Sequence, residues 1–343
     1  MPPLPFSIPR MKLKIAFGVS LLLWGIFWLL LLSLRGEAQE LRKVYVAVPG
    51  ISPGASSPFA IAKEMGYYRD ESLQVELVMM PAAVGTQALI GGNVEFSSAG
   101  GAAVPPALRG APIRFLFTAF HRPMYWLFSR PELRTLKSLK GRKIGVSSIG
   151  SGPDSLLRQI LRNNGIDGGR DATIMAVGAS TARFYALQAR SVDAAMLGIP
   201  ANLMAEDTGF HELVSFIQQE FLEFQGNIVV REVLQRSNPA LIEKFLRGTL
   251  KGFLYYRDNR LGAIKILSRF MKISEDRMAR TYDSILLGLT QDGTVSEELQ
   301  KKSLEHILER VGLKEPPPMD KIFNYSLTTK IYRELQAKGW RAE

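Results

Sequence analysis

Short apolar runs alternate with stretches of helical spacing along most of this chain. The first series of apolar runs, each of a length typical of a buried strand, lies at residues 44–48, 73–79, 94–98 and 113–119. The stretches between them end at glycines, as helices often do. After the turn-forming segment 129–142 the alternation returns, with apolar runs at 143–147, 172–177 and 192–197. This repetition predicts an α/β fold with two parallel sheets, each covered by helices.

Two extended segments connect the predicted sheets. Residues 124–128 lead out of the first series and residues 226–231 lead back, so a double-crossover hinge is expected between two lobes. Lobe one is predicted to comprise residues 41–127 plus 224–343, and lobe two residues 128–223. From Asn238 onward the chain has amphipathic helical spacing, and this helical C-terminal segment is expected to pack on lobe one.

The N-terminal segment has the pattern of an export signal. Arg10, Lys12 and Lys14 precede an uncharged apolar run at 15–34. Gly36 and Ala38 then provide small residues at the two positions that a signal peptidase recognises. This pattern predicts a signal peptide over residues 1–38 and a periplasmic mature protein. The run is also long enough to span a bilayer, so an uncleaved N-terminal anchor is the alternative.

Composition narrows the class of protein. With 46% hydrophobic and 22% charged residues, the chain of 343 residues is typical of a folded globular protein. It contains no cysteine, which excludes disulfides, thiolate metal sites and thiol nucleophiles. The net charge of +11 could favour nucleic acid, an anionic membrane face or an anionic ligand. Because Lys and Arg form no sustained run, nucleic-acid binding is not expected and a solvated basic surface is the simple interpretation.

Candidate binding groups follow three of the predicted strands, in loops rich in serine and glycine. These loops read PGISPGASSP, SSAGGAA and SSIGSGPDS. In open parallel sheets ligands bind at the carboxyl ends of strands, where free amides at helix starts can receive anions. Each loop alone is also an ordinary turn, and Ser57 is expected to cap a helix beginning at Pro58. The candidate ligand-binding residues in these loops are Ser56, Ser57, Ser98, Gly100, Ser148, Ser151 and Gly152.

Aromatic residues near the exit from lobe one are further candidates. Phe120 and Tyr125 bracket this exit, although most aromatic side chains are simply core. His121 lies at a predicted strand end, where it could bind a ligand or be a surface histidine. The chain has no HExxH helix, no Gly-x-Ser-x-Gly elbow, no phosphate loop and no dinucleotide fingerprint. An enzyme, a metal site and a cofactor are therefore not expected.

Three segments of the chain read VEFSSAGGAA, LKGRKIGVSSIGSGPDSLL and SVDAAMLGIP. Together they resemble segments of the solute-binding proteins of nitrate, sulfonate and taurine ABC importers, a family that includes binders of thiamine pyrimidine precursors. The resemblance implies a type II periplasmic-binding fold that closes around a solute. It places Ser57, Gly100, Ser148, Ser151 and Gly152 along the cleft, with Ile199 and Pro200 on the far wall. The chain has Gly198-Ile199-Pro200 where many relatives have Trp-Glu-Pro, which leaves the solute open.

The expected function is therefore solute capture for transport. The chain is predicted to be a monomeric periplasmic component of an ABC importer that binds a small anionic solute and delivers it to an inner-membrane permease. A membrane-tethered sensory or scaffold protein with the same cleft is the alternative.

Overall fold

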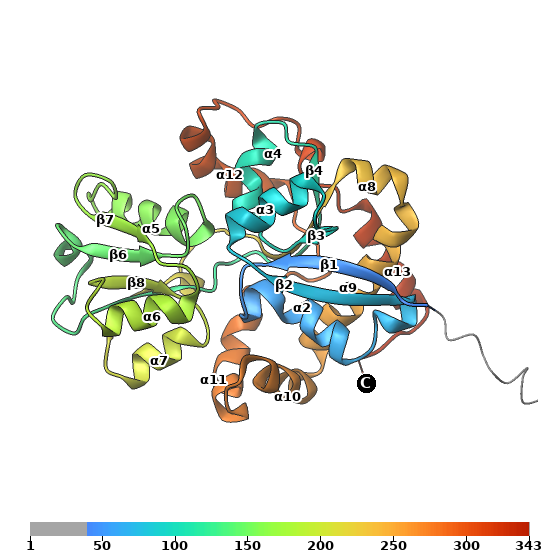
Figure 1. Cartoon of the computed structure of the whole chain (residues 1–343), viewed down its shortest axis with the longest axis horizontal. Helices are drawn as coiled ribbons and strands as arrows, with labels where there is room; N and C mark the ends of the chain where they lie inside the picture. Colours follow the sequence, from blue (N-terminus) through green and yellow to red (C-terminus); the bar gives the residue numbers. More distant parts are fainter. Residues whose placement is uncertain (1–39, 343) are drawn as a thin grey trace, which may run out of the picture. The chain divides into compact units, whose positions relative to one another are not determined.

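The computed structural model describes residues 40–342, and Arg42–Glu343 forms one compact unit. The predicted signal peptide or anchor lies outside the described residues. Among the residues that the structure describes, no helix is both long and apolar enough to cross a bilayer. The described chain carries two five-stranded sheets, shown in Figure 1.

The first sheet combines four strands from the start of the compact unit with β10, which comes much later in the chain. β1 pairs in parallel with β2 and with β3, whereas β10 runs antiparallel between β3 and β4. The order is β2-β1-β3-β10-β4. These strands are β1 (Arg42–Val48), β2 (Leu73–Met79), β3 (Phe96–Ser97), β4 (Ile113–Phe120) and β10 (Gln225–Arg231).

The second sheet repeats this arrangement in the order β7-β6-β8-β5-β9. β6 is parallel to β7 and β8, and β5 is antiparallel to β8 and β9. The strands are β5 (Trp126–Ser129), β6 (Lys143–Val146), β7 (Thr173–Ala176), β8 (Ala194–Leu197) and β9 (His211–Ser215). The prediction of two sheets is confirmed.

The prediction of purely parallel sheets is wrong, because the two crossing segments themselves join the sheets. β5 and nearly all of β10 are buried, so their backbone amides and carbonyls require partners, and a neighbouring strand supplies them. Each returning strand therefore enters antiparallel to its neighbours. β9 was not predicted at all, since His211 and Glu212 at its start obscure the apolar pattern. The exact lobe boundaries at residues 127–128 and 223–224 stay a prediction.

Helices cover both faces of each sheet (Figure 1). α3 and α4 lie over one face of the first sheet and α2 lies on the other, while α5 lies opposite α6 and α7 on the second sheet. Their bounds are α2 (Pro53–Glu64), α3 (Ala82–Gly91), α4 (Gly100–Leu108), α5 (Gly152–Asn163), α6 (Ser180–Gln188) and α7 (Ala201–Asp207). The two faces of the first sheet bury separate clusters: Ala47 belongs to one and Val46 and Val48 to the other, as strand alternation requires.

α2 begins earlier than the sequence predicted. Ser52 is its N-cap, its Oγ accepts the Ala55 amide at 3.2 Å, and Pro53 occupies the first turn. The prediction that Ser57 caps this helix is wrong, because the turn-like sequence Pro-Gly-Ala-Ser-Ser is itself helical.

The C-terminal helices pack on the first sheet, as predicted. α9 contacts α2, α12 contacts α4, and α13 contacts both α9 and β4. The helices are α8 (Glu232–Ser237), α9 (Pro239–Asp258), α10 (Arg260–Met271), α11 (Glu275–Leu286), α12 (Glu297–Val311) and α13 (Ser326–Ala337).

Phe245 of α9 lies at the centre of an aromatic stack in this core. Its ring is fully buried and lies 3.9 Å from that of Phe96, 5.3 Å from that of Tyr68 and 6.2 Å from that of Phe59, all nearly parallel. The stack joins α9, β3, the turn before β2, and α2. Aromatic pairs at these distances stabilise beyond the area they bury.

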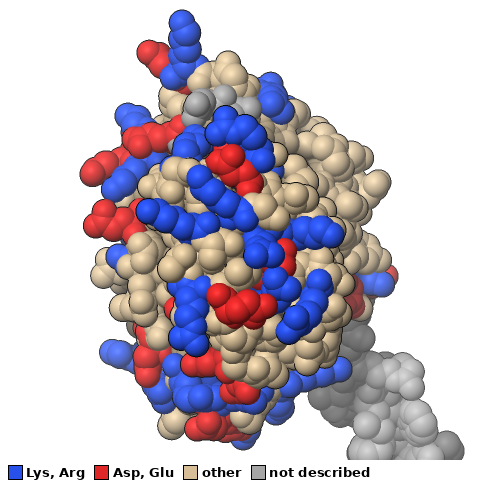
Figure 2. Space-filling view, turned by 90° about the vertical axis from the view of Figure 1, so that its left-hand side faces the viewer, with Lys and Arg blue, Asp and Glu red and all other residues tan. Residues whose placement is uncertain are grey.

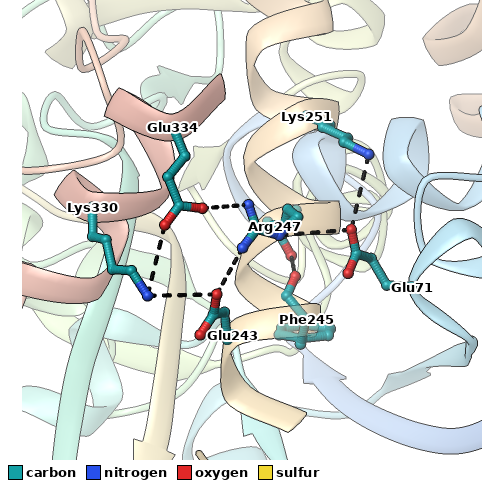
Figure 3. A network of polar contacts seen from close by, with 8 residues as sticks. Glu71, Glu243, Phe245, Arg247, Lys251, Lys330 and Glu334 are labelled. Carbon is teal, nitrogen blue, oxygen red and sulfur yellow. Dashed lines mark hydrogen bonds and ion pairs between the residues drawn. The ribbon is translucent and has the colours of Figure 1, made fainter. Parts of the chain in front are cut away.

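An ion-pair network joins the last helix to the body of the first sheet (Figure 3). The Arg247 guanidinium of α9 lies 2.7 Å from the Glu243 carboxylate, 2.8 Å from that of Glu334 in α13 and 3.8 Å from that of Glu71. The Arg247 side chain is only 18% exposed, so these charges are less screened than those of surface pairs. The network fixes α13 against α9.

The surface beside the second sheet carries charges of both signs. Figure 2 shows Lys and Arg side chains spread over this face with Asp and Glu between them. Among the residues of the second sheet and its loops, Arg130 pairs with Asp193 at 2.7 Å and Arg170 with Asp171 at 3.2 Å. This mixture is typical of a solvated surface.

Candidate functional site

A cavity of about 570 Å³ lies where the carboxyl ends of strands from both sheets meet. Loops of the first sheet contribute residues 49–55, 79–82 and 98–102, and loops of the second sheet contribute 147–148, 151–153, 178–181 and 198–200. The hinge segments add 124–125 and 223–226, and the end of α10 adds 270–272. Its size and position are those of small-molecule sites in α/β folds.

Eight of the twelve candidate residues line this cavity. They are Ser98, Gly100, Tyr125, Ser148, Ser151, Gly152, Ile199 and Pro200. The serines and glycines among them were predicted from loops that follow strands, Tyr125 from the exit of lobe one, and Ile199 and Pro200 from the family resemblance. Their contact with a solute stays a prediction.

Four candidates lie elsewhere. The hydroxyls of Ser56 and Ser57 donate to the carbonyls of Ser52 and Pro53 within α2, at 3.0 and 2.7 Å. Phe120 is fully buried in the core, with its ring 5.9 Å from that of Tyr256. These residues do not line the main cavity, because a longer α2 and an inward-facing β4 place them behind it.

His121 lines a different cavity of about 520 Å³, together with Arg257 and Leu289. Its amide donates to the Gly288 carbonyl at 2.8 Å. Burial, and then the charge of Arg122, lowers the pKa of its imidazole below the usual value. The strand end was predicted correctly, but this side chain faces away from the main cavity.

Two serine hydroxyls at the main cavity lack partners. The Oγ atoms of Ser98 and Ser148 are buried and make no hydrogen bond within the described chain. Ser98 follows β3 of the first sheet and Ser148 follows β6 of the second. Because a buried hydroxyl without a partner costs about 1–3 kcal/mol, a polar solute touching both walls would satisfy them.

The amide-rich loop before α5 uses its donors internally. The Gly150 amide donates to Asp154 Oδ2 at 2.7 Å, and the Ser151 amide to the Ser148 carbonyl at 3.2 Å. Asp154 is buried in the first turn of α5 and pairs with Arg158 at 2.8 Å. The Asp154 carboxylate therefore already lies at the N-terminus of α5, where the sequence analysis predicted that an anionic ligand could bind.

Glu223 is the principal group that the sequence did not single out. It stands in the hinge just before β10, where its carboxylate accepts the Gln225 side-chain amide at 2.7 Å. A Cβ at Gly101 would lie 3.2 Å from Glu223 Oε1, and one at Gly152 would overlap this carboxylate. Burial against these glycines raises the pKa of Glu223 to about 7. The only sequence signal was a lone acidic residue in the apolar run Phe-Leu-Glu-Phe.

Arg183 of α6 provides a buried positive charge at the same cavity. It is 2% exposed and donates to the carbonyls of Met196 and Gly178. It makes no ion pair among the described residues, and burial lowers its pKa to about 10. Tyr125 interacts with both charges: burial is the main cause that raises the pKa of its phenol, Glu223 raises it further and Arg183 opposes this shift.

Glu223→Gln should make the protein more stable at pH 8 but not at pH 4. The folded-state pKa of Glu223 lies above the ordinary glutamate value of about 4.3, so its contribution is full below that value and is lost as pH rises through about 7. Above pH 7 the wild-type protein must bury a charge that glutamine does not carry. The expected gain at pH 8 is on the order of 2 kcal/mol in the free energy of unfolding, measured by urea titration. Glu220→Gln, an exposed neighbour, is the control. The same gain at pH 4 and pH 8 would contradict the assignment.

The sequence of this chain also matches the model of a known protein family. A family model described as "NMT1/THI5 like" matches residues 55–260, more than half of the chain. The chain belongs to the NMT1/THI5-like family. No curated protein sequence matches it significantly.

Solved structures share the fold of this NMT1/THI5-like protein at low identity. The alkanesulfonate-binding protein SsuA from Xanthomonas axonopodis pv. citri, bound to MOPS, is 18% identical with a TM-score of 0.65, covering 85% of this chain and 97% of its own. The periplasmic nitrate-binding protein NrtA from Synechocystis PCC 6803 is 14% identical with a TM-score of 0.68, covering 87% and 90%. These neighbours are members of the periplasmic-binding-protein fold, so the predicted fold class and the resemblance to nitrate and sulfonate binders are confirmed.

The same fold also serves an enzyme. The desulfurization enzyme DSZB is 14% identical with a TM-score of 0.61, covering 85% of this chain and 99% of its own. Within the described chain, no group of three or more His, Asp or Glu side chains is arranged to hold a metal ion. The fold is thus shared by solute-binding proteins and by an enzyme.

Proposed function

We propose that this protein is the periplasmic solute-binding component of an ABC importer. The observation that carries the proposal is the cavity between the two sheets, with an unpartnered serine hydroxyl on each wall. A solute that satisfies both hydroxyls would be held by both lobes at once and would favour the closed arrangement. The closed complex would then be delivered to a permease in the inner membrane, with the binding protein acting as a monomer.

The expected anionic solute has less support than solute capture itself. That expectation depended on the basic net charge and on the amide-rich loops, and in the loop before α5 the Gly150 and Ser151 amides already donate to Asp154 and to the Ser148 carbonyl. Arg183 remains a group that could receive an anion, although two carbonyls already accept its N–H groups. The charge of the solute is thus a separate question from its capture.

A thermal-shift screen of the purified protein tests solute capture. The panel contains sulfonates, carboxylates, nitrate, bicarbonate, pyrimidines and organic amines. A solute present at ~100 times its dissociation constant should stabilise the folded protein by about 2.7 kcal/mol. The double variant Ser98→Ala, Ser148→Ala should lose most of that shift, because it removes one cavity hydroxyl from each sheet.

Ser56→Ala is the matched control, since that hydroxyl bonds within α2 and lies outside the cavity. A solute whose shift survives the double variant unchanged would bind elsewhere. A flat response to every compound in the panel would count against solute capture.

A further inference from the structure

We infer that the cavity selects an organic cation, a solute whose amine or amidinium group donates N–H hydrogen bonds to the carboxylate of Glu223 while its apolar body contacts the cavity wall. This inference depends on the proposed function of the cavity and adds to it the chemical class of the solute. A cationic solute is the opposite of the anionic solute that the sequence analysis predicted.

The position of Glu223 carries the inference. Its carboxylate lies against Gly101 at the start of α4 and Gly152 at the start of α5, so it stands where the two sheets approach each other. The carboxylate fits at this position because Gly101 and Gly152 have no side chains. A solute that enters from the cavity therefore meets this carboxylate at the contact between both walls.

The protein supplies Glu223 with no cation of its own. No Lys, Arg or His in the described chain forms an ion pair with it, and its one side-chain partner is the neutral amide of Gln225. A carboxylate can accept about four hydrogen bonds. A half-buried charge without a counter-ion is unfavourable, so a cationic solute would supply the ion-pair partner that the protein lacks.

The other charged groups of the cavity do not substitute for that cation. Arg183 donates to two carbonyls, and Lys272 at the end of α10 is exposed to solvent. Asp154, in the first turn of α5, is itself negative and so provides no counter-ion for Glu223. The charge of Glu223 also affects Tyr125, because it raises the pKa of the tyrosine further than burial alone does. An anion placed near Glu223 would meet like charge unless the carboxyl took up a proton.

The remaining wall suits an apolar body. Ile51 and Met79 are both 44% exposed although they are large and apolar, and both line the cavity. Met80, Ile199 and Phe270 extend this apolar surface. Methionine side chains adapt to varied shapes, so the surface fits a hydrocarbon or ring attached to the cationic group.

Binding of a cation should also change the protonation of Glu223. The carboxyl is about half protonated near pH 7, and a cation favours its charged form. Affinity should therefore rise by about tenfold between pH 6 and pH 8, with release of a proton on binding near neutral pH. A hydrogen-bonded neutral solute would show a weaker dependence.

Titration calorimetry with four phenyl compounds tests the inference on the full-length protein. Benzamidine and phenethylamine carry cationic groups, whereas benzoate and benzenesulfonate carry anionic ones. The two cations should bind, more tightly at pH 8 than at pH 6, and Glu223→Gln should weaken both by at least tenfold. Glu220→Gln, an exposed carboxylate in the same hinge segment, should leave them unchanged.

The possible failures are distinguishable. If benzoate or benzenesulfonate binds and the cations do not, the inference is overturned while solute capture stands. If Glu223→Gln binds the cations as tightly as the wild-type protein, Glu223 is not their partner and the inference also fails. Silence of all four compounds at millimolar concentration would count against both the inference and the proposed function. Thermal unfolding of Glu223→Gln confirms that the variant is folded.

Discussion

Replacing Gly152 with alanine should weaken solute binding by about tenfold or more, equivalent to about 1.4 kcal/mol, while the protein remains folded. A Cβ at this position would overlap the Glu223 carboxylate. The amide and Cα of Gly152 also lie 3.2 Å from where a Cβ at Gly101 would stand, so the two sheets meet here with no spare room. Alanine at position 152 would displace the Glu223 carboxylate from its place at the base of the cavity.

The backbone gives Gly152→Ala no other reason to fail. Gly152 begins α5 without a positive φ, and alanine is favoured over glycine in helices. Gly50→Ala is the matched control, because Gly50 lines the same cavity and a Cβ there would meet no atom within 4 Å. Calorimetry with any solute found by the screen provides the measurement. Equal affinities of the two variants would show that closure does not depend on the contact at Gly152.

Replacing Phe245 with alanine should lower the free energy of unfolding by about 3–5 kcal/mol, the largest effect on stability that we expect. The substitution removes a ring with no exposed surface and leaves Phe96, Tyr68 and Phe59 facing an empty volume. Because these three rings belong to three separate elements, the surroundings have little freedom to close the gap. Urea unfolding followed by circular dichroism measures the change.

Two further variants separate packing from helix propensity. Phe245→Leu keeps most of the buried volume and should lose clearly less stability than Phe245→Ala. Val233→Ala alters a side chain that is 52% exposed in the neighbouring helix α8, and should change the free energy of unfolding by less than about 0.5 kcal/mol. A loss at Phe245→Ala no greater than that of Val233→Ala would mean that the stack contributes nothing.

The fold could be predicted largely because its signals are local. Apolar runs such as 44–48, bounded by turns, define strands, and glycines such as Gly165 mark where helices end. The prediction failed where the partner of a segment is distant in the chain. β10 is an apolar run like the others, but its antiparallel insertion between β3 and β4 depends on the returning path of the chain.

The candidate site also combines residues that could be predicted from local sequence with residues that could not. Ser98, Ser148 and Gly152 were identified because strand ends converge in an α/β sheet, which is a property of the fold class. Glu223 and Arg183 were missed, since a single charged residue in a hinge or a helix carries no pattern. Only the packing of Glu223 against two glycines far away in the chain places it at the cavity.

The position of α13 bears on how the protein acquires its structure during synthesis. Glu334 and Thr328 of this last helix bond to Arg247 and to the Leu116 carbonyl, and the first sheet also needs β10 between strands made much earlier. Contacts of such long sequence separation form late and raise the contact order. An emerging chain that has completed β4 still lacks the strand and the helix that cover it. The N-terminal half should therefore remain open, and accessible to chaperones, until nearly the whole chain has been made.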